Sequence, residues 1–233
     1  MTDYVISPAT RASVAVLESD ARFAVRRIFC VGRNYAAHAR EMGHDPDRDP
    51  PFFFTKPADA VVDNSSTIPY PPLTKNFHFE AELVVAIGSA GRKIDQNDSL
   101  SHVWGYAIGN DLTRRDLQSA AKDKGRPWDW GKAFDRSAPC GPVHPVSVVG
   151  HLSKGSIKLT VNDQVKQDAD LTELIWSIPE VISILSRSVA LEPGDLIYTG
   201  TPAGVGPLVV GDVCKISIEG LSDLITTIAQ PLG

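Results

Sequence analysis

The stretch FEAELVVAI, residues 79–87, decides most of what this sequence predicts. It is rich in branched apolar residues and ends at Gly88, a pattern typical of a β-strand. Side chains two positions apart on a strand point to the same face, so Glu80 and Glu82 are expected to point together. Two like charges held that close repel each other unless a positive group lies between them.

A second apolar run, residues 104–110, leads directly into Asp111 and offers a third carboxylate. A ligand set made only of oxygens suits a hard cation. The sequence therefore predicts a metal site for Mg²⁺ or Mn²⁺ at Glu80, Glu82 and Asp111. The alternative is that two acids on one strand merely line a solvated face, and the spacing alone does not separate these interpretations.

The composition restricts the class of protein. The chain has 233 residues, of which 42% are hydrophobic, enough for one substantial core. A net charge of −5 argues against nucleic acid or an anionic membrane as the main partner. Cys30, Cys140 and Cys214 form no C-x-x-C pair and fit reduced thiols in a cytoplasmic protein. We find no signal peptide, and no apolar run approaches the roughly 18 residues of a membrane helix.

Short apolar runs separated by turns recur along the rest of the chain. We expect strands at residues 4–6, 28–31, 52–55, 157–161, 164–167, 196–199, 213–218 and 224–228. Helices are expected at residues 35–42, 112–123, 171–174 and 179–186, the first capped by Asn34. The charged, proline-broken residues 44–51 are a candidate lid.

Irregularly spaced short strands with few helices indicate a mainly-β or α+β fold rather than a doubly wound nucleotide-binding sheet. We expect a lead-in segment at residues 1–25 and a single catalytic domain at residues 26–233.

His38 and Glu41 lie three residues apart in an expected helix, so they are neighbours on one face. A carboxylate that accepts from one imidazole nitrogen makes the other nitrogen a better base, which suits activation of water. The alternative is an ordinary exposed His–Glu pair, and the spacing by itself favours that alternative.

Other candidate residues have equally plain alternatives. Lys132 lies between aromatic residues and either stabilises a developing negative charge or keeps its head in solvent. Arg114, Arg115 and Gln118 follow Asp111 on an expected helix and either hold an acidic substrate or form a solvated face. Thr201, in the glycine-rich turn 200–206, either helps to hold a carboxylate or belongs to a plain connection. No G-x-S-x-G nucleophile elbow and no phosphate-binding loop occurs.

Taken together, these residues resemble the fumarylacetoacetate hydrolase family from about Arg26 to the end of the chain. The matching segments, in one order, are residues 32–35 with His38 and Glu41, 54–57, 79–83, 105–106, 110–113, 115–118, 132–134, 194–195, 199–202 and 204–206. The length is similar to the short acylpyruvate hydrolase branch.

The resemblance implies a mixed β-roll with flanking helices, usually a homodimer, with one Mg²⁺ or Mn²⁺ on the three carboxylates. It also implies that His38 and Glu41 activate water from a segment that orders over the substrate. Lys132 would then stabilise charge on the substrate, and Arg115, Gln118 and Thr201 would hold a pyruvate-like end.

The implied reaction is hydrolysis of a carbon–carbon bond in a 2,4-diketo acid. Residues 51–60 and 114–118 suggest fumarylpyruvate as the substrate, in gentisate-type aromatic catabolism. A cation from Arg33, Arg114 or Arg126 would hold the fumaryl end. Decarboxylation of oxaloacetate and general acylpyruvate hydrolysis are the alternatives on the same site.

Overall fold

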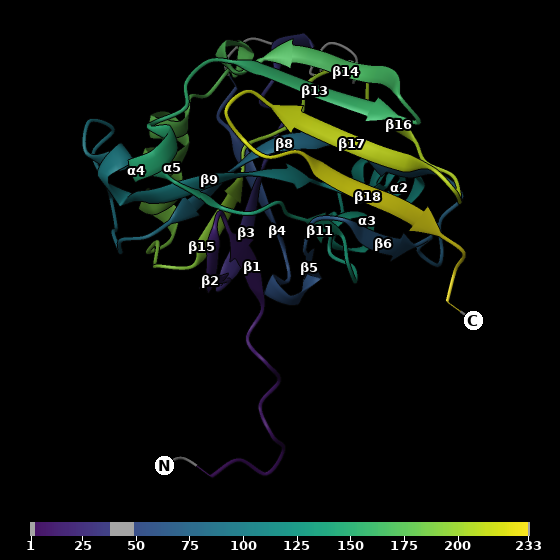
Figure 1. Cartoon of the computed structure of the whole chain (residues 1–233), viewed down its shortest axis with the longest axis horizontal. Helices are drawn as coiled ribbons and strands as arrows, with labels where there is room; N and C mark the ends of the chain where they lie inside the picture. The colour runs from purple at the N-terminus through teal and green to yellow at the C-terminus, as the bar shows by residue number, and fades with distance from the viewer. Residues whose placement is uncertain (1–2, 38–48, 233) are drawn as a thin grey trace.

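The structure is a computed structural model that describes residues 3–37 and 49–232. Its larger sheet is mixed (Figure 1). The strands follow the order β12 (His144–Pro145), β9 (Val103–Asn110), β8 (Ala81–Ile87), β15 (Asp195–Tyr198), β3 (Arg27–Gly32) and β4 (Phe52–Lys56). β15 pairs with β3 in parallel, and the neighbouring pairs are antiparallel.

A second sheet packs against β8 and β9 (Figure 1). Its strands follow the order β14 (Gln164–Asp170), β13 (Ser156–Val161), β17 (Val213–Ile218), β18 (Leu224–Ala229) and β6 (Ser66–Pro69). The β13–β14 hairpin turns at Asn162 and Asp163, which both have positive φ angles, as expected for a two-residue hairpin loop.

Strand β8 is buried on both faces and contributes to two hydrophobic clusters. Leu83, Val85 and Ile87 pack between the two sheets. Val84 and Ala86 point the other way, into a cluster with residues of β3 and β15. Because both faces are covered, the strand has a continuous apolar sequence rather than an alternating one.

Short elements surround the point where β8 begins. A small sheet has the order β10 (Thr113–Arg114), β7 (Phe77–Phe79) and β16 (Gly206–Pro207). β7 ends at Phe79 and β8 starts at Ala81, so Glu80 lies in the break between them. Two further pairs are β1 (Ser13–Val16) with β2 (Ser19–Ala24), and β5 (Val61–Val62) with β11 (Ala138–Pro139).

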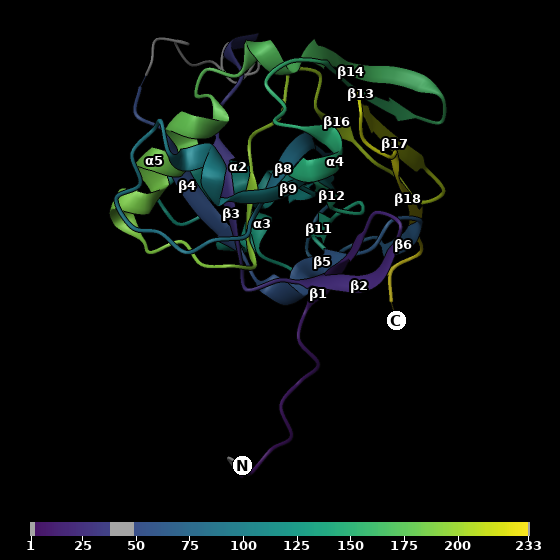
Figure 2. The same cartoon turned by 60° about the vertical axis from the view of Figure 1, so that its left-hand side comes forward.

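The helices lie at the margins of the sheets, and Figure 2 shows α5 at the left and strands β17 and β18 of the second sheet at the right. They are α2 (Arg115–Asp123), α3 (Asp129–Lys132), α4 (Val146–Val149) and α5 (Ile178–Ser188), with 3₁₀ turns η1 (Ala58–Ala60), η2 (Ser99–His102) and η3 (Leu171–Glu173). A capping box between Ser177 and Glu180 begins α5. No helix in the described part of the chain is long and apolar enough to span a bilayer.

The mainly-β prediction is confirmed, and most predicted strands are present. The edge strand at residues 4–6 was wrong: these residues are extended away from the body, and the hairpin β1–β2 forms later in the segment (Figure 1). Helix α2 begins at Arg115 rather than residue 112, because Thr113 and Arg114 pair with β7. The division at residue 25 remains a prediction.

The expected cap at Asn34 was also wrong. Its side chain donates to the carbonyls of Trp176 and Thr199 and accepts from the Trp176 N–H. It therefore joins distant loops instead of capping a helix. Ala36 and Ala37 are helical, whereas the rest of the expected 35–42 helix and most of the candidate lid lie outside the described residues.

Candidate active site

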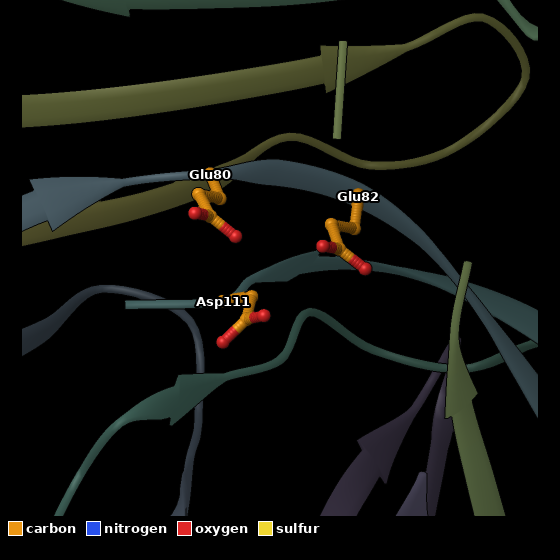
Figure 3. Close-up of side chains that lie close together, drawn as sticks. All are labelled: Glu80, Glu82 and Asp111. Atoms are coloured by element: carbon orange, nitrogen blue, oxygen red, sulfur yellow. The ribbon is translucent and has the colours of Figure 1, made fainter. Parts of the chain in front are cut away.

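Three buried carboxylates converge where β8 and β9 lie side by side (Figure 3). Glu80 directly precedes β8, Glu82 is its second residue, and Asp111 follows the last residue of β9. One oxygen from each side chain lies within 4.8 Å of the others. Asn110 stabilises this corner, because its side-chain oxygen accepts from the Glu80 N–H at 2.9 Å.

Two cationic side chains bind the carboxylates directly. The Lys132 Nζ donates to Glu80 Oε2 and to Asp111 Oδ2, both at 2.7 Å. Arg115 donates to the other Glu80 oxygen. Burial disfavours the charged form of Lys132, but the Asp111 and Glu80 carboxylates outweigh it and raise the pKa above the ordinary lysine value. This direction favours the ammonium form of Lys132.

A third cation, Lys56, lies behind Asp111. Its Nζ is 2.9 Å from Asp111 Oδ1 and donates to the carbonyls of Leu112 and Lys132. Burial lowers its pKa despite the neighbouring Asp111. The contact with Asp111 lacks hydrogen-bond geometry, so Asp111 Oδ1 has no hydrogen-bond partner among the described residues.

Glu82 is the carboxylate least compensated by described cations. Its Oε2 accepts from the Gly200 N–H at 2.8 Å. Gly200 has a φ of 99°, and a Cβ there would lie 2.7 Å from the Cβ of Asn34, so this close approach requires glycine. Burial, together with the charges of Asp111 and Glu80, raises the pKa of Glu82 well above its ordinary value. A cation between these carboxylates would remove the repulsion.

The remaining candidates line a pocket above the carboxylates. Gln118 Oε1 accepts from Arg115 Nη1 at 2.6 Å, which fixes both side chains on one face of α2. Gln167 Nε2 donates to Thr201 Oγ1 at 2.8 Å and so orients the Thr201 hydroxyl. The wall is completed by residues of β3, β4 and α2 and by Trp128.

Of the three arginines considered for a fumaryl group, Arg33 lines this pocket. Arg114 stacks on the Phe134 ring with its guanidinium carbon 4.2 Å from the ring centroid, and neither Arg114 nor Arg126 lines the pocket. His38 and Glu41 lie outside the described residues.

Sequence reasoning missed the side chains that hold the site residues. Lys56 was not predicted to contact the carboxylates, although a lysine that directly follows the apolar run 52–55 is a weak signal of a buried charge. Gln167, at 1% exposure, gave no signal, because it lies in a hairpin remote in sequence from Thr201.

The model of the fumarylacetoacetate (FAA) hydrolase C-terminal family matches residues 27–229. The observed fold agrees with this match, and the chain belongs to this family. Within it, the chain is similar to the fumarylpyruvate hydrolase of a Ralstonia species, with 43% identity over 80% of this chain and 98% of that protein. The mitochondrial oxaloacetate decarboxylase of Dictyostelium discoideum is 39% identical over 84% of this chain and 90% of its own length.

A solved structure is similar over almost the whole chain. It is a fumarylpyruvate hydrolase from Pseudomonas aeruginosa in complex with Mn²⁺ and pyruvate. The TM-score is 0.96 at 50% identity, with 98% of this chain and 100% of that chain covered.

Proposed function

We propose that this enzyme, a hydrolase of carbon–carbon bonds, cleaves fumarylpyruvate into fumarate and pyruvate. The observation that carries the proposal is the pocket floor, where three buried carboxylates meet Lys132 and Arg115. Similarity to two fumarylpyruvate hydrolases supports this substrate. In a cell the reaction would belong to gentisate-type aromatic catabolism, and we propose a cytoplasmic homodimer.

The floor fits a divalent cation. Glu80, Glu82 and Asp111 supply oxygen ligands, which Mg²⁺ and Mn²⁺ prefer. Asp111 Oδ1 lacks a hydrogen bond, and Glu82 carries a repulsion that a cation would relieve. When bound, such an ion would polarise the carboxylate and 2-oxo group of the substrate. Mg²⁺ and Mn²⁺ are both compatible with this donor set.

The protein's own residues divide the remaining work. Arg115, Gln118 and the Thr201 hydroxyl would hold the pyruvate end of the substrate, since all three line the pocket. The Gln167 amide already donates to Thr201 Oγ1, which leaves the hydroxyl hydrogen for a substrate oxygen. Gln118 and Arg115 fix each other, so the end of the substrate would meet preformed partners.

Hydrolysis requires an activated water molecule. His38, oriented by Glu41, would take a proton from water, and the oxygen would add to carbon 4 of the substrate. Breaking the bond between carbons 3 and 4 leaves fumarate and a pyruvate enolate. The Lys132 ammonium would stabilise that enolate charge, and protonation of carbon 3 would complete pyruvate.

Oxaloacetate decarboxylation is the second candidate, favoured by similarity to the Dictyostelium enzyme. It too produces a pyruvate enolate, so the Lys132 role is unchanged, but it needs no attacking water. Replacing His38 would then abolish hydrolysis and spare decarboxylation.

The deciding experiment follows substrate absorbance with purified protein and Mg²⁺ or Mn²⁺. Fumarylpyruvate, acetylpyruvate and oxaloacetate are assayed separately, with and without EDTA. Fast, EDTA-sensitive loss of fumarylpyruvate supports the proposal, whereas turnover of oxaloacetate alone would replace it with the decarboxylase function. Comparable turnover of both acylpyruvates would make the enzyme a general acylpyruvate hydrolase.

A further inference from the structure

We propose that Arg33 and Lys122 form a second anion subsite at the mouth of the pocket. This subsite would bind the distal carboxylate of a dianionic acylpyruvate, and the inference rests on the proposed function. It would explain how one pocket distinguishes a substrate with a charged far end from one that ends in a methyl group.

Helix α2 connects the floor of the pocket to its mouth. Its pocket-lining residues are Arg115, Gln118, Ser119, Lys122 and Asp123, a spacing that places them on one face. Arg115 is bonded to Glu80 at the floor, and Lys122 follows seven residues later. This separation corresponds to about 10 Å of helix rise. It is comparable with the length of extended fumarylpyruvate.

Arg33 also lines the pocket and comes directly after β3. Gly32 has no side chain, and a Cβ there would lie 2.0 Å from Phe52 Cζ, so the Phe52 ring occupies that space. The Arg33 guanidinium carbon lies 5.3 Å from the centroid of the same ring. Arg33 has a φ of 59°, a conformation uncommon outside glycine and often found at functional sites.

Both cations remain available for a ligand. Among the described residues, neither Arg33 nor Lys122 has an ion pair within 4.0 Å or a side-chain hydrogen bond. Asp123 is the carboxylate that shares the mouth with them, and Asp49 acts on Arg33 from outside the pocket lining. Within the described lining, the mouth therefore has two cations and one carboxylate.

The space between the two anion sites suits a flat conjugated group. Phe54 and Trp128 form one wall, with ring centroids 5.7 Å apart. The double bond of a fumaryl group is planar and apolar, so it would pack against these rings while its carboxylate reaches Arg33 and Lys122. The acetyl group of acetylpyruvate is too short to reach Arg33 and Lys122.

The test compares kcat/KM for fumarylpyruvate and acetylpyruvate in the metal-loaded enzyme. For Lys122→Met and for Arg33→Asn, we expect kcat/KM for fumarylpyruvate to fall about 10- to 100-fold more than for acetylpyruvate, chiefly through KM. Asn is chosen because it tolerates positive φ. Lys122→Arg keeps the charge and should retain the preference. Lys124→Met, at the residue that directly follows α2 and lies outside the pocket lining, should leave both values unchanged.

Salt provides a second measurement. In the wild type, KM for fumarylpyruvate should rise with ionic strength, because salt screens the contact between Lys122 and the distal carboxylate. In Lys122→Met this contact is absent, so KM should rise less steeply. Lys122 is exposed, so its replacement does not threaten folding, and circular dichroism checks this.

The outcomes separate the two proposals. An unchanged preference in both variants, with an active wild type, would overturn the subsite and leave the proposed function standing. Equal losses on both substrates would also overturn it, because they indicate a general effect on the pocket. A wild type inactive on every acylpyruvate would refute the proposed function, and the subsite with it.

Discussion

The two ends of strand β8 differ in chemistry although both are buried. From Leu83 to Ile87 the strand is apolar and packs into two hydrophobic clusters. Its beginning, at Glu80 and Glu82, is surrounded by charge, with Asp111 beside it. One end contributes to stability by burying apolar surface, while the other keeps ions out of water.

The charges at the ionic end balance one another. Three carboxylates are set against three cations, Lys56, Lys132 and Arg115, all at most 7% exposed. Taking charges out of water is costly, and apolar residues of similar volume are often at least as stable. Stability alone therefore does not account for the charged end, which agrees with the metal and substrate site proposed above, whereas burial of apolar surface accounts for the other end.

The largest expected effect is that of Lys56→Met. It removes one partner of a buried ion pair and the Lys56 donor to the Leu112 carbonyl, while the Lys132 carbonyl keeps only the Ser137 hydroxyl as a side-chain donor. We expect a loss of about 3–5 kcal/mol in the free energy of unfolding, measured by urea denaturation of EDTA-treated protein. The exposed Lys154→Met is the control, and equal stability of the two variants would contradict this account.

At the apolar end of β8, Leu83→Ala should lower stability without changing the affinity for the metal. Leu83 is fully buried, so truncation should leave a cavity and cost about 2–5 kcal/mol in stability. The Kd for Mn²⁺ of the folded variant, measured by calorimetry, should stay close to that of the wild type. Val165→Ala, at a side chain 53% exposed, should change stability by less than about 0.5 kcal/mol. A large loss of metal affinity in Leu83→Ala would show that the two ends are not separable.

At the charged end, Glu82→Gln should lower the affinity for the metal without lowering stability, the opposite of Leu83→Ala. The amide oxygen can still accept from the Gly200 N–H, but one of three repelling carboxylates is gone. Affinity for Mn²⁺ should fall by at least about 10–100-fold, because replacing even an outer partner of a metal ligand has that effect. The Tm of EDTA-treated protein should equal or exceed that of the wild type. A lower Tm with unchanged metal affinity would assign Glu82 to folding.

The contrast also explains what the sequence alone could predict. The run of residues 79–87 carries its own signal, because branched apolar residues favour a strand wherever it packs. The two-residue spacing of Glu80 and Glu82 likewise predicts a shared side without knowledge of the fold. Both properties are local, and the sequence predicts them, although the structure interrupts the expected strand at Glu80.

Properties that depend on distant partners could not be read in this way. Helix α2 starts late because Thr113 and Arg114 pair with β7, more than thirty residues earlier in the chain. Asn34 resembles a cap locally, yet its partners are Trp176 and Thr199. Gln167 donates to Thr201 and Pro202 and accepts from the Ala81 N–H, partners that the topology brings beside it. Long-range hydrogen bonds overrode the local preference at each position.

The smallest effect is expected at an ion pair on the surface. Lys158 Nζ lies 3.1 Å from Asp168 Oδ2 across β13 and β14, and these side chains are 44% and 56% exposed. Lys132 and Asp111 are separated by a similar 2.7 Å, but their side chains are at most 2% exposed. Because water and salt screen the exposed pair, Lys158→Met should change stability by less than about 1 kcal/mol in urea denaturation. That small difference should vanish in about 1 M salt, where the Debye length is near 3 Å. A loss comparable with that of Lys56→Met would mean that proximity rather than burial determines the strength of these pairs, and the contrast between buried and exposed charge would fail.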